Sequence, residues 1–134
     1  MKNMDFYNRQ ARILSLKEKF SKNCPHCYKI LEEFEYDLKL NSYSIGRIEK
    51  YWSFLKAIHE RLGVCFDKAK RGDVEKLIVE IDDDNKWSEW TKIDFKKIIK
   101  FFYRWLKNGS LEGDYPSIVK WIKVKMKRKK PEDS

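Results

Sequence analysis

Apolar residues recur along most of the chain at intervals of three or four, and no two alternating segments are joined by a hairpin turn. The most regular pattern begins after Ser44, a suitable N-cap, and ends before Gly63, a suitable C-cap. Its apolar positions are Ile45, Ile48, Trp52, Leu55, Ile58 and Leu62. This spacing places them on one face of a helix and predicts an all-α protein.

Two helices are predicted before this one. The first covers Asp5 to about Phe20, and its thin apolar stripe suggests a peripheral helix. The second runs from Pro25 to about Leu40, because proline is favourable at the first helical position. Much of its remaining surface is acidic, which makes it a poor candidate for facing phosphate groups; these residues are Glu32, Glu33, Glu35 and Asp37.

Three further helices are predicted after Gly63. Asp73 is suited to cap a helix over Val74–Ile81, and Ser88 is suited to cap a long one that ends near Asn108. A last short helix is expected to open at Pro116. The expected fold is a compact bundle of four to five orthogonally packed helices, with the peripheral helix in residues 1–22 and the bundle in 23–123.

The net charge of +9 is concentrated near the C-terminal end of the chain. Residues 88–134 hold 13 basic and 6 acidic residues, and residues 124–134 are expected to form a basic linker or tail. No apolar run is long enough to span a membrane, and three cysteines argue against a disulfide framework. We therefore expect a cytoplasmic protein without a membrane partner.

The strongest candidate site is a basic stripe on the predicted helix after Ser88. Lys92, Lys96 and Lys100 recur every four residues, and Lys97, Arg104 and Lys107 widen the stripe. Core formation does not require these charges, whereas a polyanion would relieve their mutual repulsion. Duplex nucleic acid is the favoured partner. The alternative is a protein-interaction module whose basic face binds an acidic protein.

The sequence offers weak signals for metal binding or catalysis. Cys24 and Cys27 form half of a zinc site, but only Cys65 and His59 are available to complete it, and each falls within or beside an apolar stripe. We therefore interpret the pair as a coincidence of the helix start and expect no metal or cofactor. The acidic run Asp82–Asp84 is expected to be solvated, and no catalytic motif or convincing histidine base is present.

Three segments resemble the N-terminal SAM-like, core-binding domain of tyrosine recombinases, in particular those of archaeal Xer-type integrases. Residues 42–51, SYSIGRIEKY, resemble the opening S-x-x-T-x-x-x-Y of that domain. Residues 88–92, SEWTK, and 100–106, KFFYRWL, are similar to its second signature. Residues 115–123 are similar to the segment that leads into the catalytic domain. The resemblance covers about residues 28–134.

The resemblance implies that the chain grips one side of duplex DNA through two basic helices. The implied contacts from the matched motifs are Ser44, Arg47, Lys50, Thr91, Lys92, Lys97 and Lys100, and the charge pattern adds Lys96 and Arg104. Ser44 stands where many relatives have threonine, and Lys100 where many have arginine. Lysine cannot bind guanine in the bidentate manner of arginine, so base readout from Lys100 is not expected.

The resemblance also implies that catalysis belongs elsewhere. In the family, the arginines, histidine and tyrosine nucleophile lie in a separate C-terminal domain, so this chain alone is not expected to be an enzyme. Its expected partners are double-stranded DNA, a catalytic domain of the same polypeptide and other recombinase subunits on the DNA.

Overall fold

The computed structural model describes residues 3–125, and all regular secondary structure within this range is helical. In order, the elements are α1 (Asn3–Asn23), α2 (Pro25–Leu40), α3 (Ile45–Leu62), the 3-10 turn η1 (Phe66–Lys68), α4 (Arg71–Asp83), α5 (Glu89–Asn108) and α6 (Ser117–Lys120). The predicted all-α bundle is therefore confirmed. Most of the expected basic linker over residues 124–134 lies outside the described residues.

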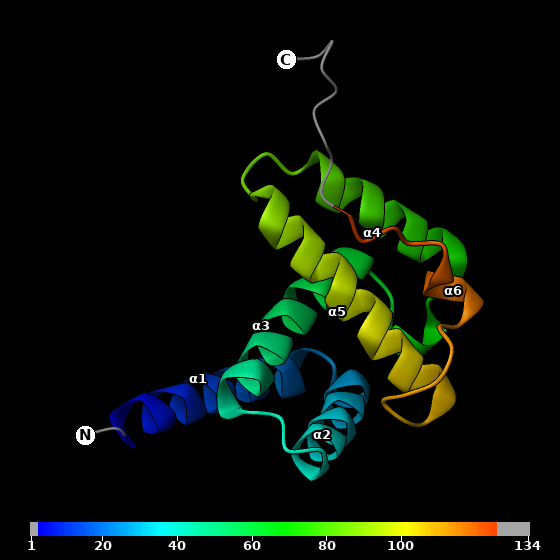
Figure 1. The fold of residues 1–134 in the computed structure, drawn as a ribbon. Coiled ribbons are helices and arrows are strands. Elements are labelled where there is room, and N and C mark those ends of the chain that lie inside the picture. Colours follow the sequence, from blue (N-terminus) through cyan, green and yellow to red (C-terminus); the bar gives the residue numbers. More distant parts are fainter. Residues whose placement is uncertain (1–2, 126–134) are drawn as a thin grey trace.

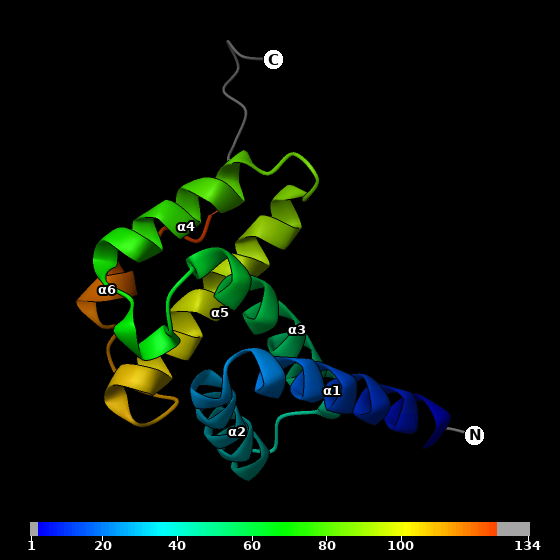
Figure 2. The ribbon, with the colours of Figure 1, turned by 180° about the vertical axis from the view of Figure 1, so that it is seen from behind.

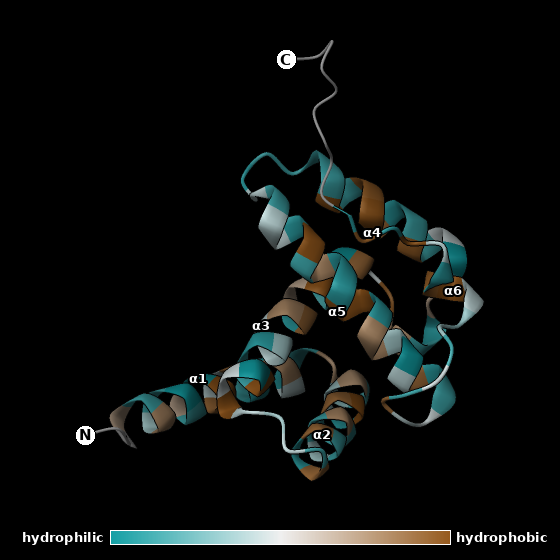
Figure 3. Cartoon of the chain, in the orientation of Figure 1, coloured by the Kyte–Doolittle hydropathy of each residue, from teal (hydrophilic) through white to brown (hydrophobic). Residues whose placement is uncertain are grey.

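The helix α3 joins two groups of elements (Figures 1 and 2). The first group consists of the helices α1 and α2, and the second consists of α4, α5 and α6. The helix α3 packs against both helices of the first group and against α4 and α5 of the second. Figure 3 shows that the polar residues of the helices lie largely on the outside of this arrangement. Within residues 3–125, no helix combines the length and apolar character needed to cross a membrane.

The two long central helices begin and end where their capping residues predict. The Ser44 hydroxyl accepts a hydrogen bond from the Arg47 backbone N–H at 3.2 Å, and the Ser88 hydroxyl accepts one from Thr91 at 3.2 Å. Gly63 and Gly109 end the helices with φ values of 77° and 78°, a left-handed conformation that glycine adopts without steric cost.

The start of α4 differs from the prediction. The helix begins at Arg71 rather than Val74, so Asp73 lies inside its first turn instead of preceding the helix. There the Asp73 carboxylate accepts the Lys70 backbone N–H at 2.9 Å. The aspartate thus still satisfies an N-terminal amide, but from the third helical position, which is the geometry of half a capping box.

The helix α1 is peripheral only in part. Its first turn extends beyond the other helices (Figure 1). Its C-terminal half contributes Ile13 and Phe20 to the core, and the Phe20 ring lies 4.9 Å from the His59 ring and 6.3 Å from the Phe66 ring, centroid to centroid. Its apolar stripe, thin in sequence, is therefore sufficient to dock one half of the helix.

The centre of the core is aromatic and lies along α5. Phe102 and Tyr103 are fully buried, and the Tyr103 hydroxyl donates to the Phe66 carbonyl at 2.9 Å. Burial also raises the pKa of Tyr103, so the phenol stays protonated and remains a donor. On the next turn, the Trp105 indole donates to Asp37 at 2.6 Å and thereby ties α5 to α2.

A buried carboxylate connects α1, α2 and α3. Glu35 is 6% exposed and accepts a hydrogen bond from the Trp52 indole at 2.7 Å. Lys17 and Lys39 form ion pairs with it at 3.0 and 2.8 Å. Burial alone would raise the pKa of Glu35, but the two lysines and the indole outweigh this effect and hold the pKa below its ordinary value.

We predict that Glu35→Gln lowers the free energy of unfolding at neutral pH by about 2 kcal/mol, because two lysines lose a partially buried counter-charge. The pKa of Glu35 is lower in the folded state than in the unfolded state, so its ionisation stabilises the protein at pH values above the ordinary glutamate pKa of 4.5. This contribution is lost as the pH falls through the folded-state pKa. Urea unfolding should therefore show a weaker loss of stability on acidification in the variant than in the parent.

The matched control is Glu33→Gln, which removes an exposed carboxylate from the same helix and should change stability by less than about 0.5 kcal/mol. Equal effects of the two substitutions would contradict the role assigned to Glu35.

Candidate functional site

A basic hollow of about 800 Å³ opens between the start of α3 and the middle of α5. Five cationic side chains and one carboxylate line it, and four aromatic rings form much of its wall. The charged residues are Arg47, Lys50, Asp94, Lys97, Lys100 and Arg104, and the aromatic ones are Tyr43, Tyr51, Phe101 and Tyr115. All five cations belong to the set predicted from sequence.

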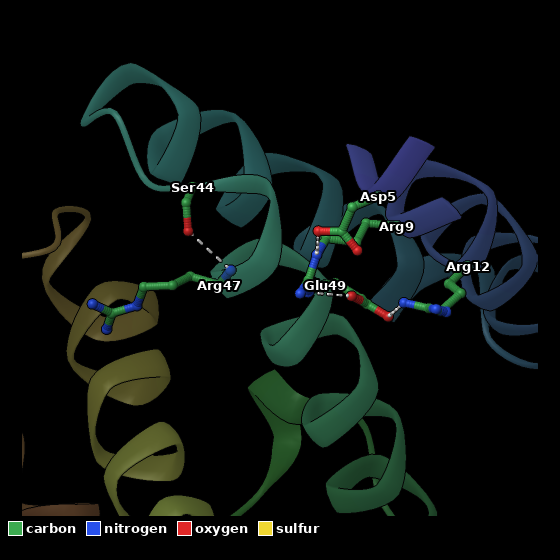
Figure 4. Close-up of polar contacts among 6 residues, drawn as sticks. All are labelled: Asp5, Arg9, Arg12, Ser44, Arg47 and Glu49. Atoms are coloured by element: carbon green, nitrogen blue, oxygen red, sulfur yellow. Dashed lines mark hydrogen bonds and ion pairs between the residues drawn. The ribbon is translucent and has the colours of Figure 1, made fainter. Parts of the chain in front are cut away.

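The cap of α3 sets the direction of its first basic residue. With Ser44 bonded to the Arg47 amide, the Arg47 side chain extends towards α5 (Figure 4). Glu49, two residues later, extends instead towards α1, where it accepts hydrogen bonds from Arg9 at 2.9 Å and Arg12 at 3.2 Å. Helical rotation of about 100° per residue thus separates a basic side of α3 from the side that packs on α1.

On α5 the basic side chains of the hollow lie within two turns. Lys97 and Arg104 are seven residues apart, so they return to nearly the same direction on the helix. Lys97 is exposed and makes no salt bridge with a described residue. Lys100 is half-buried, and its ammonium group donates to the Ile122 carbonyl at 2.9 Å, which ties the segment after α6 to α5.

The aromatic residues hold the cations in place rather than neutralising them. The Arg104 guanidinium lies 4.6 Å from the Tyr115 ring and 5.6 Å from the Phe101 ring. Arg47 lies 5.1 Å from the Tyr43 ring and also donates to the Tyr51 hydroxyl at 2.8 Å. The buried Nε of Arg104 has no hydrogen-bond partner among the described residues.

Asp94 is the one acidic side chain of the lining, and it pairs with Lys50 at 2.9 Å. Both groups of this pair are substantially exposed, so it is screened by water and only partly offsets the positive charge. The arrangement suits an anion with several oxygens, because guanidinium and ammonium groups converge from two helices on one concave surface.

Three residues of the predicted basic stripe, Lys92, Lys96 and Lys107, do not line the hollow. Lys92 is 8% exposed and donates to the Asp82 carbonyl at 2.8 Å, and Lys96 forms an ion pair with the Asp82 carboxylate at 2.8 Å. A step of four residues advances the direction of a side chain by about 40°, so Lys92 and Lys96 turn away from Lys100 towards α4. The expectation that both are free to contact a partner is therefore wrong.

The two hydroxyl residues also have local roles. Ser44 and Thr91 lie at the starts of α3 and α5, outside the lining of the hollow. The Ser44 oxygen is used by the Arg47 amide, and the Thr91 hydroxyl lies 3.2 Å from the Ser88 hydroxyl. Their positions shape the ends of the helices that carry the basic residues.

Sequence reasoning missed the aromatic part of the site. Tyr43 and Tyr115 lie in connections between helices, where a helical periodicity carries no information on side-chain direction. The only sequence feature that could have indicated their role is their position close to the basic helices along the chain. The acidic residue Asp94 was missed because its distance from Lys50, 44 residues earlier in the chain, depends on how α3 and α5 cross.

The cysteines gather at a different place in the fold. Cys24 and Cys27 lie at the α1–α2 junction, and their sulfur atoms and a ring nitrogen of His59 lie within 4.8 Å of one another. The Cys24 sulfur also lies 4.0 Å from the Cys65 sulfur. Burial raises the pKa of Cys27 to about 12. Burial also opposes ionisation of Cys24, but the backbone N–H of Cys27 and neighbouring thiols outweigh it and lower the pKa of Cys24. The fold therefore brings His59 and Cys65 close to the cysteine pair, which the sequence pattern alone did not indicate.

Comparisons with known protein families, with curated proteins and with solved structures find no match for this chain.

We predict different effects for two lysines of α5. Lys92→Ala should lower the free energy of unfolding by about 1–2 kcal/mol, because it leaves the Asp82 carbonyl without its donor. The exposed Lys97→Ala should change it by less than about 0.5 kcal/mol. Urea unfolding followed by circular dichroism measures both values, and a neutral Lys92→Ala would contradict the structural role of this lysine.

Proposed function

We propose that the chain binds duplex DNA and that the basic hollow between α3 and α5 is the contact surface. The observation that carries the proposal is the convergence of five cationic side chains, with a single carboxylate among them, on one concave face. Phosphate groups along DNA are the polyanion that such a surface fits, since each neutralised phosphate releases condensed counterions.

The charge distribution of the remaining surface supports an oriented contact. A second hollow lies beside α2 and the end of α5, and it is lined by Glu32, Glu33 and Asp37 with Lys29 as its one cation. An acidic face of this kind repels DNA. The two faces together favour a single orientation of the protein on the duplex.

The contacts expected from the hollow are mainly to phosphates. Arg47, Lys50 and Lys97 are exposed, so their cationic groups are accessible to phosphate oxygens along the two strands. Lys100 already donates to a backbone carbonyl, and Arg104 is held between aromatic rings. This division favours positioning of the duplex over reading of its base sequence.

Within this proposal, the resemblance to tyrosine recombinases assigns a role to the contact. The chain would be a core-binding domain that holds DNA for a separate catalytic domain of the same polypeptide, which breaks and rejoins the strands. Other recombinase subunits on the same DNA would then be its neighbours. This role is supported by the order of the sequence motifs and by the basic hollow between α3 and α5.

The central test replaces the three exposed cations of the hollow, Arg47, Lys50 and Lys97, by alanine. Fluorescence anisotropy with a mixed-sequence duplex measures affinity from low to moderate salt. At physiological salt we expect the parent to bind with a Kd on the order of 10⁻⁴ to 10⁻⁶ M, and more tightly at low salt. The triple variant should bind at least about tenfold more weakly, and the slope of log K against log salt should decrease by roughly 2–3.

The matched control replaces Lys19, Lys22 and Lys29, which are exposed residues of α1 and α2 outside the hollow, and changes the net charge equally. It should keep most of the affinity. Equal weakening by both triple variants would refute the assignment of the face. Absence of binding by the parent at tens of micromolar protein and low salt would refute DNA as the partner and favour an acidic protein.

A second experiment tests the proposal that this chain binds DNA and that a separate domain cleaves it. Incubation of the chain with supercoiled plasmid should leave the plasmid supercoiled, because strand cleavage is assigned to a different domain. Gel electrophoresis after protease treatment detects relaxed or protein-linked DNA. Relaxation that increases with protein concentration and is lost in Tyr115→Phe would contradict a purely binding role.

A further inference from the structure

Three potential metal ligands lie close together at the edge of the core, and a fourth lies beside one of them. Cys24 precedes α2, Cys27 lies in its first turn, His59 lies in the last turn of α3, and Cys65 precedes η1. The ligand atoms of Cys24, Cys27 and His59 all lie within 4.8 Å of one another. The Cys24 and Cys65 sulfur atoms are 4.0 Å apart, although the residues are 41 positions apart in sequence.

These distances are close to those of a tetrahedral zinc site. With Zn–S bonds of about 2.3 Å and Zn–N bonds of about 2.0 Å, ligand atoms around one ion lie roughly 3.5–3.8 Å apart. Cys24, Cys27 and His59 reach that spacing if their widest pair closes by about 1 Å. Cys65 lies outside this group of three, 4.0 Å from the Cys24 sulfur, and completes the set by moving closer to Cys27 and His59. Three cysteines and one histidine form one of the ligand sets of structural zinc sites, which have four protein ligands and no open position.

The surroundings of the cluster also suit a structural ion. The Phe66 backbone N–H donates to the Cys27 sulfur at 3.5 Å, a contact that stabilises negative charge on that sulfur. The His59 ring packs against two neighbouring phenylalanine rings, with centroids 4.9 Å from Phe20 and 5.1 Å from Phe66. Cys27 is fully buried, whereas Cys24 and Cys65 are partly exposed, so an ion has a route of entry.

We propose that Cys24, Cys27, His59 and Cys65 bind one Zn²⁺ ion as a structural site. The ion would cross-link the α1–α2 junction to the end of α3 and to η1. The main rival is a disulfide between Cys24 and Cys65. A disulfide would use two of the four groups and leave unexplained why Cys27 and His59 converge on the same point.

The site is independent of the proposed DNA contact. Arg47 and His59 are twelve residues apart on α3, which corresponds to about 18 Å along the helix axis. Either proposal can therefore fail without the other, and the zinc experiments below use no DNA.

The first experiment measures metal content. The chain is produced in zinc-supplemented medium, purified under reducing conditions and analysed by inductively coupled plasma mass spectrometry. We expect one zinc ion per chain in the parent. Cys24→Ser and Cys65→Ser should each lose most of it, and zinc competition should give affinities at least about tenfold weaker. The control is His26→Ala, which lies within the Cys24–Cys27 segment but has its ring 2.8 Å from Asp67.

A second measurement does not depend on the folding of the variants. Removal of zinc from the parent by a chelator should lower the Tm by roughly 10 °C or more, and addition of Zn²⁺ alone should restore it. Cobalt(II) added to the metal-free parent should give the intense visible bands of a tetrahedral site with thiolate ligands, and His26→Ala should give the same spectrum.

Three outcomes would overturn the proposal. The first is a parent that contains no zinc and gives no tetrahedral cobalt spectrum. The second is retention of full zinc content by both serine variants. The third is a Cys24–Cys65 disulfide found by mass spectrometry of the non-reduced protein as isolated from the cell.

Discussion

The enclosure of α5 by its neighbours is the constraint on which the rest of the structure depends. This helix packs against α3, α4 and α6, and Trp105 also bonds to α2. An amphipathic helix surrounded in this way keeps only a narrow exposed strip. Any polar side chain of α5 must then lie on that strip or find a partner at its edge. Lys97 lies on the exposed strip, whereas Lys92 lies at its edge and donates a hydrogen bond to the Asp82 carbonyl near the end of α4.

The enclosure of α5 also explains which features of the structure were predictable from the sequence and which were not. Capping residues and periodicity are local, so Ser44, Gly63, Ser88 and Gly109 correctly marked the ends of α3 and α5. The basic residues of the hollow were also identified from sequence, but Lys92 and Lys96 were wrongly grouped with them. Their pairing with Asp82 depends on the packing of α4 against α5, which no spacing within α5 can reveal.

Long-range placement explains the other differences. Cys65 follows the end of α3, and its distance from Cys24 is set by the path of a short connection that has no periodicity of its own. The docking of α1 involves Phe20, whose aromatic partners come from α3 and η1, far away in sequence. Local patterns therefore gave the elements, whereas contacts between distant segments decided which of their polar residues meet.

The position of Arg104 between the rings of Phe101 and Tyr115 has a further consequence. A free arginine side chain loses considerable rotamer entropy when it is fixed against a ligand. Here the rings restrict the guanidinium during folding, before any anion arrives, and they also remove part of its hydration. An anion that reaches Arg104 therefore meets a preorganised group, and less of the favourable contact energy is cancelled by the ordering of the side chain.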